Sequence, residues 1–179
     1  MTKGVTIIMS GAKPWRYASN WITLLVFIVV FIGLIIVLGE LFTKPKTPTT
    51  AENIWNLLIA EGLEPQDVTD FYMKEGSSLV KGIGVQKDDL RFEFFTFSNA
   101  NGAIDAYAKF RALIVQTRRS FPYAEHDTKS ANYCIYSLKS EGIFNVSIYV
   151  GNTAVYAYCN EENSETISSI LREIGYFNS

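Results

Sequence analysis

Histidine and cysteine are scarce in this chain, which limits the chemistry it offers. Its 179 residues include one histidine, His126, and two cysteines, Cys134 and Cys159. Asp127 follows His126, but adjacent side chains rarely point at one another, and no serine or cysteine is marked as a nucleophile. We therefore expect no catalytic residue and a protein that is not an enzyme.

Patterns that bind metals and phosphates are also missing. The acidic groups have spacings that suit caps and turns as well as metal ligands, and none forms a calcium loop; they are Asp67 with Asp70, Asp88-Asp89 and Glu161-Glu162. Gly82 and Gly84 lie in an expected strand without the rest of a phosphate-binding motif, which indicates a bulge or a close approach of another segment. The sequence predicts no metal and no cofactor.

Clustered cations are absent as well. Five of the 16 Lys and Arg residues and one of the 18 Asp and Glu residues precede residue 51, so residues 51–179 hold 11 cations and 17 anions, a net charge of −6. Arg118-Arg119 is the single adjacent basic pair of this region and suits a helix end. Because nucleic-acid binding needs clustered cations, this composition argues against a nucleic-acid partner.

The chain does contain one long apolar run, Trp21 to Phe42, without a charge as far as Gly39. At about 1.5 Å per residue its 22 residues reach roughly 33 Å, the thickness of a bilayer core. A secretory signal has a shorter apolar region, of about 7 to 15 residues. We predict a retained transmembrane anchor over 21–42, and cleavage after the tolerable triplet 37–39 is the alternative.

Flanking cations give the orientation of this span. Lys3, Lys13 and Arg16 precede it, and Lys44 and Lys46 follow it. The small excess before the span predicts a single-pass protein of the cell membrane with a cytoplasmic tail, 1–20, and its C-terminal domain outside. The Pro/Thr segment 43–50 is expected to be an extended linker of up to about 25 Å that holds the domain off the membrane.

Hydrophobic periodicity and turn residues then divide residues 51–179 into elements. Helices are predicted at 50–61, 98–118 and 163–175, with a further turn or short helix near 64–73, and strands at 79–86, 90–98, 132–139, 143–150 and 153–159. The polar segment 120–130 is expected to be a loop. Short connections favour antiparallel pairing. The predicted fold class is α+β: an α-β-β-α-β-β-β-α domain whose five-stranded antiparallel sheet carries helices on one face.

The last three strands allow a prediction of register. Gly151-Asn152 is a two-residue hairpin signal that pairs Val150 with Thr153. For the preceding turn, a three-residue loop, 140–142, keeps apolar side chains opposite one another and pairs Leu138 with Phe144. A two-residue loop would oppose Leu138 to Asn145, so the three-residue loop is preferred.

This register has a consequence for the cysteines. Cys134 and Cys159 would lie about 16 Å apart, with one strand between them, on the core face of the sheet. A disulfide needs Cα atoms within about 7 Å. We therefore expect two free, buried thiols.

The same register gathers tyrosines on the opposite face, which is the candidate binding face: Tyr133, Tyr149, Tyr156 and Tyr158. Exposed tyrosines can grip peptides or stack on sugar rings. The alternative is that tyrosine is present because it favours strands and stabilises cross-strand pairs.

Three stretches carry a resemblance: DVTDFY at 67–72, FEFFTFSNANGAIDAYAKF at 92–110 and ILREIGY at 170–176. In these, residues 52–176 resemble single-span, membrane-anchored extracytoplasmic domains of Gram-positive bacteria. The resemblance implies a bacterial cell surface and this fold, and it implies no activity and no site residue.

Two functions are compatible with these features. The first is a non-enzymatic extracytoplasmic interaction domain of the cell envelope that binds an envelope protein or glycan. The alternative is an accessory or sensor subunit of a membrane complex that acts through its transmembrane helix, although Gly33 alone gives no seam of small residues for tight helix packing.

Overall fold

The computed structural model describes residues 21, 23–34, 44–119 and 122–178. The chain divides into two units, Met1–Lys44 and Pro45–Ser179. In the first unit Trp21 and residues 23–34 are helical. Within the described part of the chain, no helix combines the length and the apolarity that crossing a bilayer requires. The predicted tail and the rest of the predicted span, residues 22 and 35–42, lie outside the described residues.

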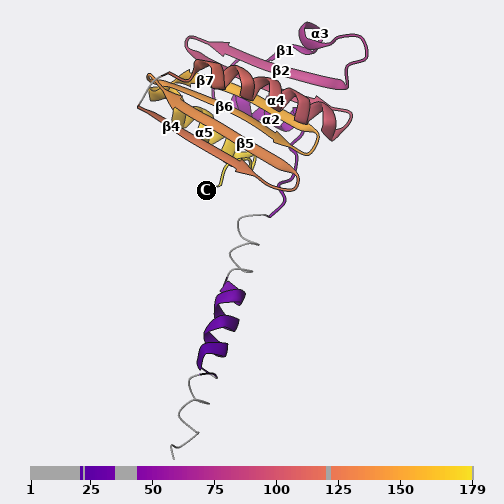
Figure 1. Cartoon of the computed structure of the whole chain (residues 1–179). Coiled ribbons are helices and arrows are strands. Elements are labelled where there is room, and N and C mark those ends of the chain that lie inside the picture. Colours follow the sequence, from indigo (N-terminus) through magenta and orange to yellow (C-terminus); the bar gives the residue numbers. More distant parts are fainter. Residues whose placement is uncertain (1–20, 22, 35–43, 120–121, 179) are drawn as a thin grey trace, which may run out of the picture. The chain divides into compact units, whose positions relative to one another are not determined.

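The second unit is an α+β fold built on one antiparallel sheet (Figure 1). Its strands are β1 (Gln66–Asp67), β2 (Leu79–Lys87), β3 (Leu90–Phe97), β4 (Tyr123–Lys129), β5 (Tyr133–Ser140), β6 (Ile143–Val150) and β7 (Thr153–Asn160). They lie in the order β1-β2-β3-β7-β6-β5-β4. The last strand in the chain is therefore the central strand of the sheet, between β3 and β6.

Helices cover both faces of this sheet. They are α2 (Ala51–Ala60), α3 (Thr69–Tyr72), α4 (Ala100–Thr117) and α5 (Ser164–Glu173), which follows the 3₁₀ turn Glu161–Asn163. Buried residues of α2 and α5 form one core with one face of the sheet, and those of α4 form a second core with the other face. Figure 1 shows α4 on one side of the strands and α2 and α5 on the other.

The α+β class and the antiparallel pairing agree with the sequence, whereas the predicted strand count of five was wrong. The segment 120–130, expected to be a loop, contains β4, which pairs with β5. Most side chains of β4 are exposed because it is the last strand at that edge of the sheet, so no apolar alternation marks it. The second additional strand, β1, has two residues and no readable pattern.

The expectation that helices cover only one face of the sheet was also wrong. The predicted three-residue turn between β5 and β6 was wrong as well. β5 and β6 are joined by two residues, Glu141 and Gly142, both with positive φ, as a tight hairpin turn requires. Leu138 therefore pairs with Asn145. Asn145 and Ser147 made this face look solvated, but α4 covers it, and the Ser147 hydroxyl donates to the Tyr107 carbonyl at 3.3 Å. The β6–β7 hairpin has the predicted register.

The described part of the linker, residues 44–50, contains no helix or strand, as an extended segment should. It is not a free spacer, however. Lys46 and Thr49 hydrogen-bond to residues from 132 to 178 of the second unit. These contacts use backbone groups and one ammonium, so a hydrophobic pattern could not reveal them.

Both cysteines are free and buried, as predicted. They do not share a face. Cys134 pairs with Tyr149 in the α4 core, and Cys159 pairs with Phe144 in the core of α2 and α5. The sheet itself therefore separates the two thiols.

This arrangement gives a prediction about thiol reactivity. In the native protein both Cys134 and Cys159 should resist an alkylating reagent, and both should react after denaturation without a reductant, because neither is bridged and both are covered. Mass spectrometry of the alkylated chain measures this. A disulfide between them would contradict the strand order, since the sheet lies between the two sulfur atoms.

Candidate functional site

The four tyrosines of the predicted binding face do not lie together. Tyr133 is buried in the core of α2 and α5, whereas Tyr149, Tyr156 and Tyr158 belong to the α4 side of the sheet. Tyr149 is 9% exposed, and its ring packs edge-on against Tyr107 of α4 with centroids 5.4 Å apart. Tyr133 and Tyr149 are therefore covered by the protein's own helices.

Tyr156 and Tyr158 lie at the margin of the surface that α4 covers, and both are half-buried. Tyr156 stacks on Phe110 of α4 with centroids 5.1 Å apart, and Phe110 stacks on Phe95 of β3 at 5.6 Å. The ring centroids of Tyr158 and Tyr156 are 6.0 Å apart. These four rings form an aromatic row from α4 across β3 and β7.

A polar cluster of Tyr72, Arg91 and Glu93 adjoins this row. One carboxylate oxygen of Glu93, Oε1, accepts from the Tyr72 hydroxyl at 2.5 Å and from Arg91 Nη2 and Nε at 2.6 and 3.0 Å. Arg91 Nη2 also donates to the Tyr72 oxygen at 2.8 Å. Burial, and then the hydrogen bond to the Glu93 carboxylate, raise the pKa of Tyr72 to about 12. The cluster pairs one cation with one anion and so adds no net charge to this surface.

Two glycines allow the chain to bring Tyr72 to this cluster. The segment before α3 crosses β2, where Val68 packs against Gly82 and Gly84. A Cβ on Gly84 would lie 2.9 Å from Val68 Cγ1, too close for any larger residue without a shift. Of the two alternatives predicted for these glycines, the close approach is confirmed, whereas both pair regularly with β3 and the register shift lies before them, between Leu79 and Lys81.

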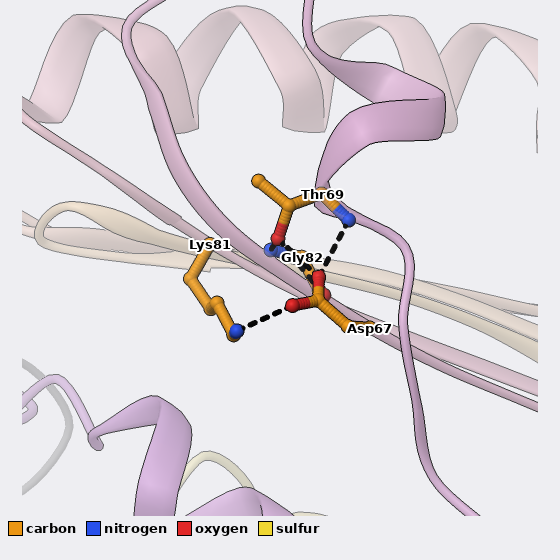
Figure 2. Close-up of polar contacts among 4 residues, drawn as sticks. All are labelled: Asp67, Thr69, Lys81 and Gly82. Atoms are coloured by element: carbon orange, nitrogen blue, oxygen red, sulfur yellow. Dashed lines mark hydrogen bonds and ion pairs between the residues drawn. The ribbon is translucent and has the colours of Figure 1, made fainter.

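Polar contacts fix the same crossing (Figure 2). The Asp67 carboxylate accepts from the Thr69 backbone N–H at 2.9 Å and from the Thr69 hydroxyl and Lys81 Nζ, each at 2.5 Å. The Thr69 hydroxyl in turn accepts from the Gly82 N–H at 2.9 Å. The bond from Lys81, followed by those from Thr69, holds the pKa of Asp67 well below its usual range. Asp67 thus anchors α3 to β2, a structural role.

A hollow of about 570 Å³ opens between α4 and the loop that joins α3 to β2. Its lining residues are Tyr72, Lys74 to Leu79, Phe95, Phe97, Gly102, Asp105, Ala106, Lys109, Phe110 and Leu113. The volume is in the range of sites that take small ligands or the side chains of a partner. Part of its floor, Phe95 and Phe110, belongs to the aromatic row, so hollow and row form one continuous surface.

The borders of the hollow are both apolar and charged. Leu113 lines the hollow from α4 and is 51% exposed. On the α3 side, Phe71 and Met73 flank the lining residue Tyr72 in sequence and are 81% and 47% exposed, and the Phe71 ring lies edge-on to the Tyr72 ring with centroids 4.9 Å apart. The charged lining side chains have both signs, with Lys74 and Glu75 on the loop and Asp105 and Lys109 on the helix. Large exposed apolar side chains on two sides of one hollow are unusual for a surface that faces only water.

The other groups named in the sequence lie away from this surface. His126 is on the exposed edge strand β4, where its Nε2 is 2.7 Å from the Thr128 hydroxyl oxygen, while Asp127 pairs with Arg111 of α4. Neighbours on a strand point to opposite faces, so the two do not meet. Among the described residues, no group of three or more His, Cys, Asp or Glu side chains could hold a metal ion.

Sequence reasoning missed Tyr72, Arg91, Glu93 and Leu113. Glu93 is 5% exposed, an unusual state for a carboxylate, but in the sequence it reads as the polar position of an alternating strand. Leu113 lies on α4 beside the buried face formed by Ala103, Tyr107 and Ile114, and it is exposed although it is apolar. An apolar residue next to the buried stripe of a helix was the available signal.

Comparisons with protein families, with curated proteins and with solved structures found no match for this chain. The resemblance to anchored domains of Gram-positive bacteria stays a prediction.

The polar cluster predicts a pH-dependent loss of stability. Tyr72→Phe should lower the free energy of unfolding by about 1.5 kcal/mol, because it removes a hydrogen bond to a charged group but keeps the ring. The difference from the wild type should be constant below pH 10, where tyrosine is neutral in both states, and should shrink between pH 10 and about 12 as the unfolded state ionises first. Urea unfolding at several pH values measures it.

Phe71→Ala is the matched control for that measurement. The Phe71 ring is largely exposed and makes one edge-on contact with the Tyr72 ring, so its loss should lower the free energy of unfolding by at most about 1 kcal/mol and by the same amount at every pH. Equal losses in the two variants would contradict the role of the Tyr72 hydroxyl.

Proposed function

We propose that this protein is a membrane-anchored, non-enzymatic interaction domain of the cell envelope, displayed outside the cytoplasmic membrane. The hollow between α4 and the α3–β2 loop, flanked by exposed Phe71 and Leu113, is the observation that carries this proposal. An apolar surface of this kind is stabilised when a partner removes it from water.

The partner we propose is a polypeptide segment of another envelope protein. The apolar floor, which includes Leu79 and Phe97, suits aliphatic or aromatic side chains, and the lining charges of both signs suit a segment that carries Lys or Arg together with Asp or Glu. The net charge of −6 over residues 51–179 disfavours an anionic polymer or an anionic lipid surface.

The first unit supports the membrane anchor. Its described apolar side chains from Trp21 to Leu34 are between 46% and 70% exposed, on every side of the helix. A helix that is apolar all round is normally buried in a protein or in a membrane. The 22-residue run from Trp21 to Phe42 supports a transmembrane span, and the cations that precede it support a cytoplasmic N-terminus.

Site-specific crosslinking tests the interaction surface. A photo-reactive amino acid at Leu113, in full-length protein made in its own cells, should give a discrete adduct with an envelope protein. The same amino acid at Ile59 is the control, since Ile59 is similarly exposed, at 54%, but lies on α2 across the sheet. Phe71→Ser should reduce the Leu113 adduct at least tenfold, as it removes an apolar border and leaves the core intact. Identical adducts from both positions, or none from Leu113, would refute the surface.

Protease protection tests the orientation separately. Protease added to intact protoplasts should remove residues 51–179 and leave the N-terminal tail protected, because the excess of cations lies before the span. Immunodetection of a tag at either end reads the result. A protected C-terminal domain would reverse the orientation, and a mature chain that begins at Glu40 would show a secreted protein.

A further inference from the structure

Both backbone polar groups of Lys46 are hydrogen-bonded to one side chain that is distant in the sequence, Asn132. Asn132, in the turn between β4 and β5, accepts from the Lys46 N–H at 3.2 Å through Oδ1 and donates to the Lys46 carbonyl at 2.7 Å through Nδ2. One amide thus satisfies both backbone groups of one residue, as a neighbouring strand would. The contact joins residues 86 positions apart.

The Lys46 side chain reaches the C-terminal residues. Its ammonium donates to the Gly175 carbonyl at 2.8 Å and to Asn178 Oδ1 at 3.1 Å, and it lies 5.3 Å from the centroid of the Tyr133 ring. A carbonyl, an amide oxygen and a π-face are all acceptors for a cation. The ammonium therefore bridges the C-terminal end of the chain and β5.

Two further contacts continue the attachment toward α2. The Thr49 N–H donates to the Tyr176 hydroxyl at 3.1 Å, and that hydroxyl shares a 2.5 Å hydrogen bond with Thr153. Pro48 lies against Gly151 in the β6–β7 turn, where a Cβ would come within 2.6 Å of Pro48 Cγ. Residues 46 to 49 therefore contact three separate places in the second unit: the β4–β5 turn, the β6–β7 turn and the C-terminal residues 175–178.

We propose that residues 45–49, which end just before the α2 cap Thr50, act as a releasable strap. When docked, the strap fixes the start of the domain on its C-terminal residues and makes a short, ordered connection. When released, the same Pro/Thr segment becomes the extended spacer that its composition favours. The strap would thus switch how the domain is connected to whatever precedes it, which goes beyond the proposed binding of a partner.

The kind of contact explains why release need not unfold the domain. Apart from Pro48 on Gly151, the strap is held by hydrogen bonds and one cation–π contact, and the bonds of the Lys46 ammonium are exposed. No strap residue belongs to either hydrophobic core. Among the described residues, the strap's contacts with the core are limited to the Tyr133 ring and the Tyr176 hydroxyl, so docking competes chiefly with the conformational entropy of a short segment.

Spin labelling of full-length protein in detergent tests the strap. A nitroxide on Thr47→Cys should be strongly immobilised in the otherwise wild-type chain and mobile when Asn132→Ala or Tyr176→Phe is added. Trypsin should cut the Lys46–Thr47 bond at least tenfold faster in these two variants without the label. Asn163→Ala is the matched control: its amide bonds Asp89 near the opposite end of β7, so its loss should leave the strap docked.

Whether the domain stays folded is measured in the same samples by the melting temperature and by the resistance of the buried Cys134 and Cys159 to alkylation. Release while the domain stays folded supports the proposal. A strap that is mobile in the wild type, one that stays docked in both variants, or one that is released only together with unfolding overturns it. If a domain variant fails to fold, Lys46→Ala gives the same readout of label mobility, because it removes the strap's own ammonium and alters no residue of the sheet or helices.

Discussion

The antiparallel pairing of β3 with β7 is the contact on which the rest of the domain depends. It joins the hairpin β2–β3 to the meander β5–β6–β7 across about sixty residues of sequence, and it makes one sheet from two local units. It also places Glu93 opposite Tyr156 and Arg91 opposite Tyr158. The aromatic row, which contains Phe95 of β3 and Tyr156 of β7, therefore exists only in the assembled sheet. Closing so long a loop is entropically costly before the contacts that offset it can form.

Burial of the sheet on both faces is the second constraint. α4 packs over β6 and β7 and reaches β3 through Phe110, while α3 and the segment before it cover β2 and reach β3 through Tyr72. The floor of the hollow includes two buried aromatic rings of β3, Phe95 and Phe97. The two sides of the hollow meet at one end, where Gly102 at the start of α4 lies against Ser78 of the α3–β2 loop.

The β6–β7 turn connects the hollow to the strap. Asn152 donates through Nδ2 to the Phe97 carbonyl at 2.8 Å, and its own carbonyl accepts from the Phe97 N–H at 2.9 Å. The preceding residue, Gly151, is the one against which Pro48 packs. The floor of the hollow and the docked segment therefore rest on adjacent residues of one turn. Both depend on a glycine at position 151, where φ is +55° and a side chain would displace Pro48.

Interactions between residues close in the sequence made several features of this protein predictable from the sequence alone. The α4 stripe, the Gly151-Asn152 hairpin and the free cysteines all follow from spacing and turn chemistry within short windows. Thr50 and Asn99 cap α2 and α4 through side-chain oxygens, so the two helices begin one and two residues after the predicted starts at 50 and 98. Such features depend on near neighbours alone, so a single sequence is sufficient to predict them.

Tertiary structure decided what spacing could not express. Glu93, Asn145 and Ser147 are polar yet buried, and their burial depends on α3 and α4 packing over them, so the sequence assigned their face to solvent. β4 is polar because it is the edge strand of the sheet, and a short stretch of sequence does not reveal which strand lies at the edge. The sequence by itself determined the three long helices and the β2–β3 and β6–β7 hairpins, since these form from local contacts. Which face each tyrosine occupies, and the existence of the hollow, were decided by pairing between distant strands and by where the helices settled.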